Sequence, residues 1–191
     1  KILMTIPLEI IDLSKTYDAK MAVRNISFKV NENEIIGILG PNGCGKTTTI
    51  GMILGLLKPT SGKVLINGIE IEKKRVDLLN ELNFISPYIE LPKKLTVKQN
   101  LEVYGRLYDV KQLGIKIDYL SEKLRLNEFI NKITGELSSG QKNRVSLAKS
   151  IINDPSVLLL DEPTASLDPE TGDFVRSFLE EYQKEKGTSI L

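Results

Sequence analysis

The sequence predicts an α/β fold on a mostly parallel sheet, with an N-terminal antiparallel β part and an inserted helical subdomain. Strand-like and helical segments alternate at both ends of the chain, and the apolar runs at residues 35–39 and 157–160 are typical of strands buried on both faces. The middle of the chain lacks β-alternating runs. Its 191 residues suit one domain. We expect its core at about residues 1–87 and 141–191 and the helical subdomain at about 88–140.

The strands are predicted from alternating or continuous apolar residues. Residues 7–12 and 26–30 have strand-like patterns, and the continuous run at 35–39 predicts a fully buried strand. Residues 63–66 are again strand-like. The Asn-Gly turn at 67–68 that follows them predicts a hairpin with the charged segment beyond it.

The helices are predicted from apolar residues spaced at i, i+3, i+4 and i+7. This spacing begins after Gly45 and stops at Pro59, and it recurs within residues 95–137, which we expect to be predominantly helical. Further helices are expected at residues 140–153 and before a last strand that begins at Thr188. The apolar faces comprise Ile50, Ile53, Leu54 and Leu57; Leu126, Phe129, Ile130 and Ile133; and Val175, Phe178, Leu179 and Tyr182.

Composition and charge argue against several classes of protein. The 26 basic and 25 acidic side chains give a formal net charge of +1, so no overall field attracts nucleic acid, and we expect no direct nucleic-acid partner. One cysteine, Cys44, and no histidine exclude an internal disulfide and a Cys/His zinc site. Any catalysis must therefore use carboxylates, Lys, hydroxyls or a metal.

The sequence contains neither a predicted membrane span nor a signal peptide. Every apolar run is well below the roughly 20 residues of a membrane span. Residues 1–13 carry acidic side chains and lack the cleavage pattern of a signal peptide. Since the chain opens without Met, we expect a fragment of a longer protein.

Residues 40–47, which we call the phosphate loop, match G-x-x-x-x-G-K-[ST] between a predicted strand and a predicted helix. Its glycines let backbone N–H groups surround phosphate oxygens, and the helix start presents its positive dipole end to them. We expect Lys46 to bridge the β- and γ-phosphates and Thr47 to offer its hydroxyl to Mg²⁺. Cys44 is either a redox-sensitive group or simply a small residue that fits. The nucleotide-binding candidates are Gly40, Pro41, Asn42, Gly43, Cys44, Gly45, Lys46 and Thr47.

The predicted strand at residues 157–160 ends in two acids, Asp161 and Glu162, which we call the acidic pair. Open α/β sheets bind ligands at the carboxyl ends of their strands. Asp161 suits the binding of Mg²⁺ through water, and Glu162 is placed to orient and deprotonate an attacking water, for which no histidine is available. An Asp-Glu-Pro sequence is also a plain strand end, and the phosphate loop is what favours the catalytic interpretation.

Residues 137–141, Leu-Ser-Ser-Gly-Gln, resemble the LSGGQ signature of ATP-binding cassette (ABC) proteins. The resemblance extends to residues 40–48, to residues 160–163 and to the Ser-Leu-Asp at 166–168, in matching order and spacing. It covers nearly the whole chain. The resemblance implies an ATP-binding domain that hydrolyses ATP with Mg²⁺, using Lys46, Asp161 and Glu162 for catalysis.

The residues at 137–141, which we call the signature segment, also have a physical interpretation. Ser138 and Gln141 form a capping-box pattern, so a helix with a positive dipole end begins here. This indicates either an ordinary capped helix or a second anion site. The resemblance implies the second, facing the ATP of another ABC ATP-binding domain in a head-to-tail dimer. It assigns to that site Ser138, Ser139, Gly140, Gln141 and Asp168.

The resemblance further assigns Thr48 to the ATP site and matches Tyr17 to the aromatic that stacks on adenine; a strand-end core residue is the alternative for Tyr17. It implies a transmembrane permease subunit as partner, docked through the helical subdomain and the loop at Pro87, with this chain on the cytoplasmic face of the membrane. The appearance of residues 56–68 and 95–108 is similar to exporter subunits, so export is favoured over import.

Three features depart from the family pattern. Pro87 stands where the family usually has a glutamine, which removes a side-chain amide from a loop that serves metal binding and membrane coupling. Ser139 replaces the second signature glycine, a mild change between small residues. The family's switch histidine would follow the strand at Thr188, but the sequence ends at Leu191. We therefore expect a truncated ATP-binding domain whose parent continues with that strand and a histidine.

Two alternatives lie in other functional classes. A non-transport ABC ATPase in translation or chromosome maintenance needs no membrane partner, but the short stretch between Pro87 and Leu137 has no room for a long coiled-coil arm. A weakly active regulatory nucleotide-binding domain is suggested by Pro87 and the missing histidine. Against it stand Lys46 and the acidic pair, all of which are present.

Overall fold

Two sheets organise the fold. The computed structural model describes residues 6–18, 20–74, 78–86, 90–164 and 167–191. The strands are β1 (Leu8–Tyr17), β2 (Lys20–Val30), β3 (Ser61–Ile66), β4 (Ile69–Glu70), β5 (Leu82–Ile85), β6 (Val157–Leu160) and β7 (Ser189–Ile190). An antiparallel sheet has the order β2-β1-β3-β4, and a parallel sheet has the order β5-β6-β7. The predicted α/β class with an antiparallel N-terminal part is confirmed, as is the β3–β4 hairpin.

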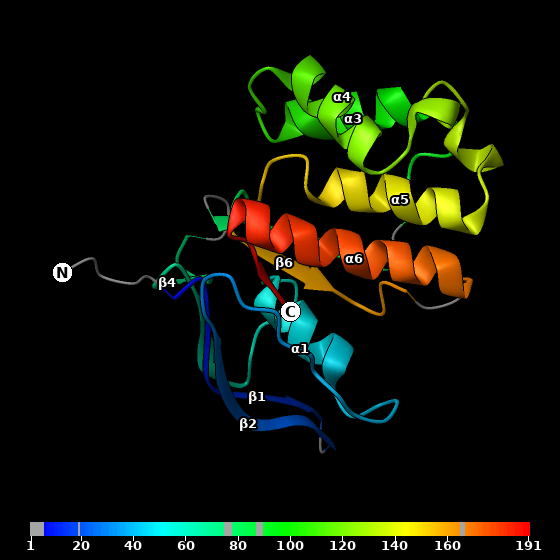
Figure 1. Cartoon of the computed structure of the whole chain (residues 1–191). Coiled ribbons are helices and arrows are strands. Elements are labelled where there is room, and N and C mark those ends of the chain that lie inside the picture. The colour runs from blue at the N-terminus through cyan, green and yellow to red at the C-terminus, as the bar shows by residue number, and fades with distance from the viewer. Residues whose placement is uncertain (1–5, 19, 75–77, 87–89, 165–166) are drawn as a thin grey trace.

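The helices cover the parallel sheet on both sides. They are α1 (Lys46–Ile53), α3 (Val97–Leu107), α4 (Leu113–Lys123), α5 (Ser139–Ser150) and α6 (Pro169–Lys186), with short 3-10 helices η1 (Asn127–Phe129) and η2 (Thr134–Glu136). Figure 1 shows α5 and α6 on one side of β6, α1 on the other, and α3 and α4 beyond α5. None of the described helices is long and apolar enough to cross a membrane.

Strand β6 is buried on both faces, as its continuous apolar sequence predicts. Val157 and Leu159 pack into a cluster formed with α1 and the antiparallel sheet, while Leu158 packs into the cluster formed by α3 to α6. All three side chains are fully buried. Because successive side chains of a strand point to opposite faces, β6 joins the two cores.

The prediction of a fully buried strand at residues 35–39 is wrong. Ile35 forms only an isolated parallel bridge with Ile190, and Leu39 is 95% exposed. The reason lies in the order of the strands: β7 lies between β6 and this segment, and Ile36 N donates to the carbonyl oxygen of Ile190 at 2.9 Å. In the described part of the chain, the contact of this segment with β7 is limited to residues 34–36.

The helix-like spacing from Leu126 to Ile133 does not form an α-helix either. The structure has the 3-10 helix η1 there, and Ile133 is 40% exposed. The backbone of this segment is hydrogen-bonded to the start of α3. Lys98 N donates to the carbonyl oxygen of Ile130, and Val97 N donates to the carbonyl oxygen of Lys132. These contacts satisfy carbonyls that a continuous helix would use internally. Helix α1 is also shorter than predicted: it ends at Ile53, whereas the sequence pattern predicts a helix up to Pro59.

Helix α3 begins with a capping box that the sequence analysis did not identify. Gln99 N donates to Thr96 Oγ1 at 3.2 Å, and Thr96 N donates to Gln99 Oε1 at 2.9 Å. Two N–H groups at the helix start are thereby satisfied. This cap fixes the point at which the chain enters the helical region.

We predict that Thr96→Ala lowers the free energy of unfolding by about 1 kcal/mol, the usual value of an N-terminal cap. Lys98→Ala, two residues further along at an exposed position of α3, serves as the control and should change it by less than about 0.5 kcal/mol. Urea unfolding of the purified protein measures both. Equal midpoints for Thr96→Ala and the unaltered protein would show that the cap does not stabilise α3.

Candidate functional site

The phosphate loop folds around the side chain of Lys46, the first residue of α1. Lys46 Nζ donates to the carbonyl oxygens of Gly40 and Pro41, at 2.7 and 3.1 Å. Gly45 has φ 101°, and a Cβ at this position would lie 2.5 Å from the carbonyl oxygen of Ala22. Only glycine therefore lets the loop lie against β2. The arrangement places an ammonium group at the centre of a loop that leads into a helix.

The remaining loop candidates lie on the same structure. Thr47 and Thr48 belong to the first turn of α1, which contains no acidic side chain. The first N–H groups of a helix lack partners within it and favour an anion. Cys44 is exposed, and its Sγ lies 2.5 Å from the point where a Cβ on Gly40 would be, so the small residue at 40 makes room for the thiol.

The acidic pair follows β6 at the carboxyl edge of the parallel sheet, as predicted. Asp161 is 7% exposed, and its N–H donates to the carbonyl oxygen of Ile85 at the end of β5, at 2.9 Å. Burial raises the pKa of the Asp161 carboxyl, the charge of Glu162 raises it further, and the Lys46 ammonium acts in the opposite direction. The carboxyl edge of the parallel sheet therefore presents one buried and one exposed acidic side chain.

The donors near this edge fit Mg²⁺. In the described part of the chain, no group of three or more His, Cys, Asp or Glu side chains could hold a metal by itself. Thr47 and Asp161 instead offer two hard oxygen donors. Magnesium usually takes only one or two protein ligands and completes its shell with water and phosphate oxygens, so this sparse set suits a metal that arrives with a nucleotide.

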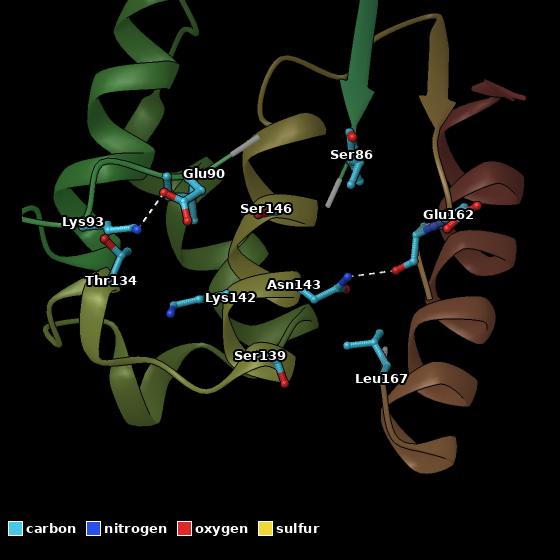
Figure 2. Close-up of a pocket in the computed structure, with 13 residues that line it drawn as sticks. Ser86, Glu90, Lys93, Thr134, Ser139, Lys142, Asn143, Ser146, Glu162 and Leu167 are labelled. Carbon is cyan, nitrogen blue, oxygen red and sulfur yellow. Dashed lines mark hydrogen bonds and ion pairs between the residues drawn. The ribbon is translucent and has the colours of Figure 1, made fainter. Parts of the chain in front are cut away.

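Glu162 lies at the mouth of a cavity of about 260 Å³ between β5, α5 and the segment after β6. Figure 2 shows its side chain across from Ser139, Asn143 and Ser146 of α5. The backbone of Glu162 has φ 51°, an uncommon conformation for a non-glycine residue. Its carboxylate is exposed and free to approach a water.

The signature segment starts α5 with the predicted capping box. Gln141 N donates to Ser138 Oγ at 3.2 Å, and Ser138 N donates to Gln141 Oε1 at 3.0 Å. A Cβ on Gly140 would lie 3.4 Å from Thr171 of α6. The segment therefore contacts the first turn of α6, and it lies apart from the phosphate loop, which lines a different hollow against β2.

Asp168 caps α6 directly beside the signature segment. Thr171 N and Thr171 Oγ1 donate to its two carboxylate oxygens at 2.9 and 2.7 Å. These hydrogen bonds hold the pKa of Asp168 below its usual value. The structure thus gives Asp168 a local structural role and also brings together the residues that the sequence assigned to the second subunit's ATP.

Tyr17 ends β1 with 44% of its surface exposed, so the core-residue alternative is wrong. Lys15 Nζ lies 5.1 Å from the ring centroid and donates to the carbonyl oxygen of Lys58 at 2.8 Å. A cation over one face of the ring fixes its position. The sequence analysis missed Lys15, although its place two residues before Tyr17 puts it on the same face of the strand.

Sequence reasoning also missed Asn143, whose Nδ2 donates to the carbonyl oxygen of Pro163 at 2.8 Å. The available signal was a polar stripe of Ser139, Asn143 and Ser146, at i, i+4 and i+7 on α5. Two predicted positions, Pro87 and Ser166, lie outside the described residues.

Comparisons with known proteins agree with this geometry. A family model described as ABC transporter matches residues 23–165. The ABC transporter ATP-binding protein NatA of Bacillus subtilis (strain 168) is 33% identical over 172 residues, 88% of this chain and 70% of that protein. The Nod factor export ATP-binding protein I of Rhizobium etli is 38% identical over 160 residues, 83% of this chain and 51% of that protein.

Solved structures give the same result. The structure of an ATP-binding subunit of an ABC transporter matches with a TM-score of 0.88 and 27% identity, covering 98% of this chain and 78% of that one. The cbiO1 protein of Clostridium perfringens, part of the ABC transporter complex cbiONQ, matches with a TM-score of 0.84 and 31% identity, covering 97% and 77%. This chain therefore belongs to the ABC transporter family as a nucleotide-binding domain, of the kind that acts as an ATPase.

Proposed function

We propose that this chain hydrolyses ATP to drive a membrane transporter from the cytoplasmic face of the membrane. The observation that carries the proposal is the phosphate loop, which encloses Lys46 Nζ at the start of α1. The acidic pair at the carboxyl end of β6 supports it. The names of the relatives support a transport role, and the Nod factor export proteins favour export as the direction. The chain spans between about half and 70% of these relatives.

Each side chain has a distinct task in the proposed reaction. Lys46 and the N–H groups of the phosphate loop bind the β- and γ-phosphates of ATP and stabilise the charge that develops on them. The ring of Tyr17 stacks on adenine, an interaction of about 1–3 kcal/mol. Thr47 and Asp161 are the residues that would hold Mg²⁺, and the bound ion would supply neutralisation of phosphate charge. Glu162, which directly follows Asp161 at the end of β6, orients the attacking water and accepts its proton.

We propose that the signature segment and Asp168 act on the ATP of a second ATP-binding domain. Two observations support this. The capping box leaves the remaining N–H groups and the positive dipole end of α5 facing outward beside Asp168. Within one chain, the phosphate loop and Ser139 line different hollows, which supports a head-to-tail partner that brings its own phosphate loop to this helix.

A groove of about 420 Å³ between the core and α3 is the proposed docking site for the membrane subunit. Two leucines on its rim, Leu56 and Leu107, are 65% and 72% exposed. Lys149 lines the groove over the ring of Tyr104, with 4.9 Å between Nζ and the centroid. No salt bridge among the described residues includes Lys149, and burial lowers its pKa. We propose that an apolar segment of the membrane subunit with one acidic side chain occupies this groove.

We predict that Glu162→Gln lowers kcat for ATP hydrolysis by about 10²- to 10⁴-fold, the usual contribution of a general base. The affinity for ATP should be retained, because Glu162 is not assigned to phosphate binding. Lys46→Ala should instead weaken ATP binding. Steady-state ATPase assays and equilibrium ATP binding on the full-length protein with its membrane subunit measure both.

The matched control for this prediction is Glu180→Gln, the same chemical change on the exposed face of α6, which should leave kcat unchanged. A Glu162→Gln protein with a normal kcat would remove Glu162 from the catalytic role.

We predict that Lys149→Glu reduces the amount of membrane subunit that co-purifies with the full-length protein by about tenfold, a coupling of roughly 1.4 kcal/mol. ATP binding by the isolated protein should persist. Lys132→Glu, at an exposed lysine outside the groove, is the control for the change in charge. Restoration of binding by an acid-to-lysine change in the membrane subunit would identify the pairing residue, whereas undiminished co-purification of Lys149→Glu would exclude this groove charge from docking.

A further inference from the structure

Glu162 is held in a backbone conformation that its sequence disfavours. Its φ of 51° lies in the left-handed region, where non-glycine residues are uncommon. The next residue is Pro163, and a residue before proline prefers extended backbone. Such a conformation persists only where surrounding contacts impose it, and these positions cluster at functional sites. The contacts around Glu162 therefore determine where its carboxylate lies.

Two hydrogen bonds hold the chain on either side of Glu162. Before it, Asp161 N donates to the carbonyl oxygen of Ile85 at 2.9 Å, which anchors the chain to β5. After it, the carbonyl oxygen of Pro163 accepts from Asn143 Nδ2 at 2.8 Å. Figure 2 shows this bond as the dashed line that crosses from α5 toward Glu162. A carbonyl oxygen only accepts, so the amide of Asn143 must present its NH₂ group here.

Asn143 connects the acidic pair to the helix that starts at the signature segment. It lies one helical turn beyond Ser139, and both side chains line the same cavity as Glu162. The side chain is half-buried, where a hydrogen bond is less exposed to competition from water. Any movement of α5 relative to β6 must stretch or break this bond.

We propose that Asn143 is a positioning residue that sets the orientation of Glu162 through the carbonyl group of Pro163. The amide imposes the left-handed backbone at Glu162 and so aims the carboxylate at the attacking water. Since Asn143 moves with the signature segment, the bond also ties the carboxylate to the position of α5, which faces the second subunit's ATP. This inference rests on the proposed role of Glu162 in hydrolysis.

The test is a double-mutant cycle on the full-length protein in complex with its membrane subunit. Asn143→Leu removes the amide with little change in volume, and we expect kcat to fall about 10- to 100-fold, as for a misplaced catalytic group. KM for ATP and the affinity for ATP should stay the same. Asn143→Gln keeps the donor and should recover most of kcat. In a Glu162→Gln background, Asn143→Leu should lower the residual single-turnover rate no further.

Ser146→Ala serves as the matched control, because it lines the same cavity from the same helix; its kcat should stay within about twofold of the unaltered protein. The inference is overturned if Asn143→Leu lowers the rate equally in both backgrounds, raises KM alone, or leaves kcat unchanged. If Asn143→Leu fails to fold, Asn143→Ala removes the side-chain donor and carries the same expectations. A normal kcat for Glu162→Gln would instead overturn the proposed function of Glu162.

Discussion

The burial of β6 on both faces is the constraint on which the rest of the structure depends. Val157 and Leu159 anchor it to the core under α1, and Leu158 anchors it to the core under α5 and α6. With β5 and β7 paired on its two edges, the strand can neither slip nor rotate. The acidic pair follows this strand at its carboxyl end. The positions of both proposed catalytic carboxylates therefore depend on the apolar packing of β6.

Much of the fold and of the site could be predicted because the signals are local. The phosphate-loop sequence specifies a strained turn that only glycine permits at Gly45, and Ser138 with Gln141 specifies a helix start from three residues of separation. The continuous apolar sequence predicts β6, and the helical spacing of the apolar residues predicts α6; both signals lie within the element itself. In each case, neighbouring residues carry enough information to determine the local structure.

The parts that failed depend on distant partners. Residues 35–39 have the composition of a buried strand, but their pairing depends on β7, which lies far away in the sequence. The segment from Leu126 to Ile133 has helical spacing, but its carbonyl groups serve α3 instead. Asn143 contacts Pro163 across 20 positions of sequence, and Lys149 is notable only because the fold buries it. Contacts between residues far apart in the chain leave no local pattern in a single sequence, so they could not be predicted from it.

In the proposed mechanism, ATP binds between the phosphate loop of one chain and the signature segment of another. The most direct measurement is a cryo-electron microscopy structure of the full-length Glu162→Gln protein with its membrane subunit, ATP and Mg²⁺. The account predicts two ATP-binding domains head to tail, with each γ-phosphate between Lys46 of one chain and the start of α5 of the other. An ATP molecule bound at Lys46 with no second chain's α5 facing it would contradict the account.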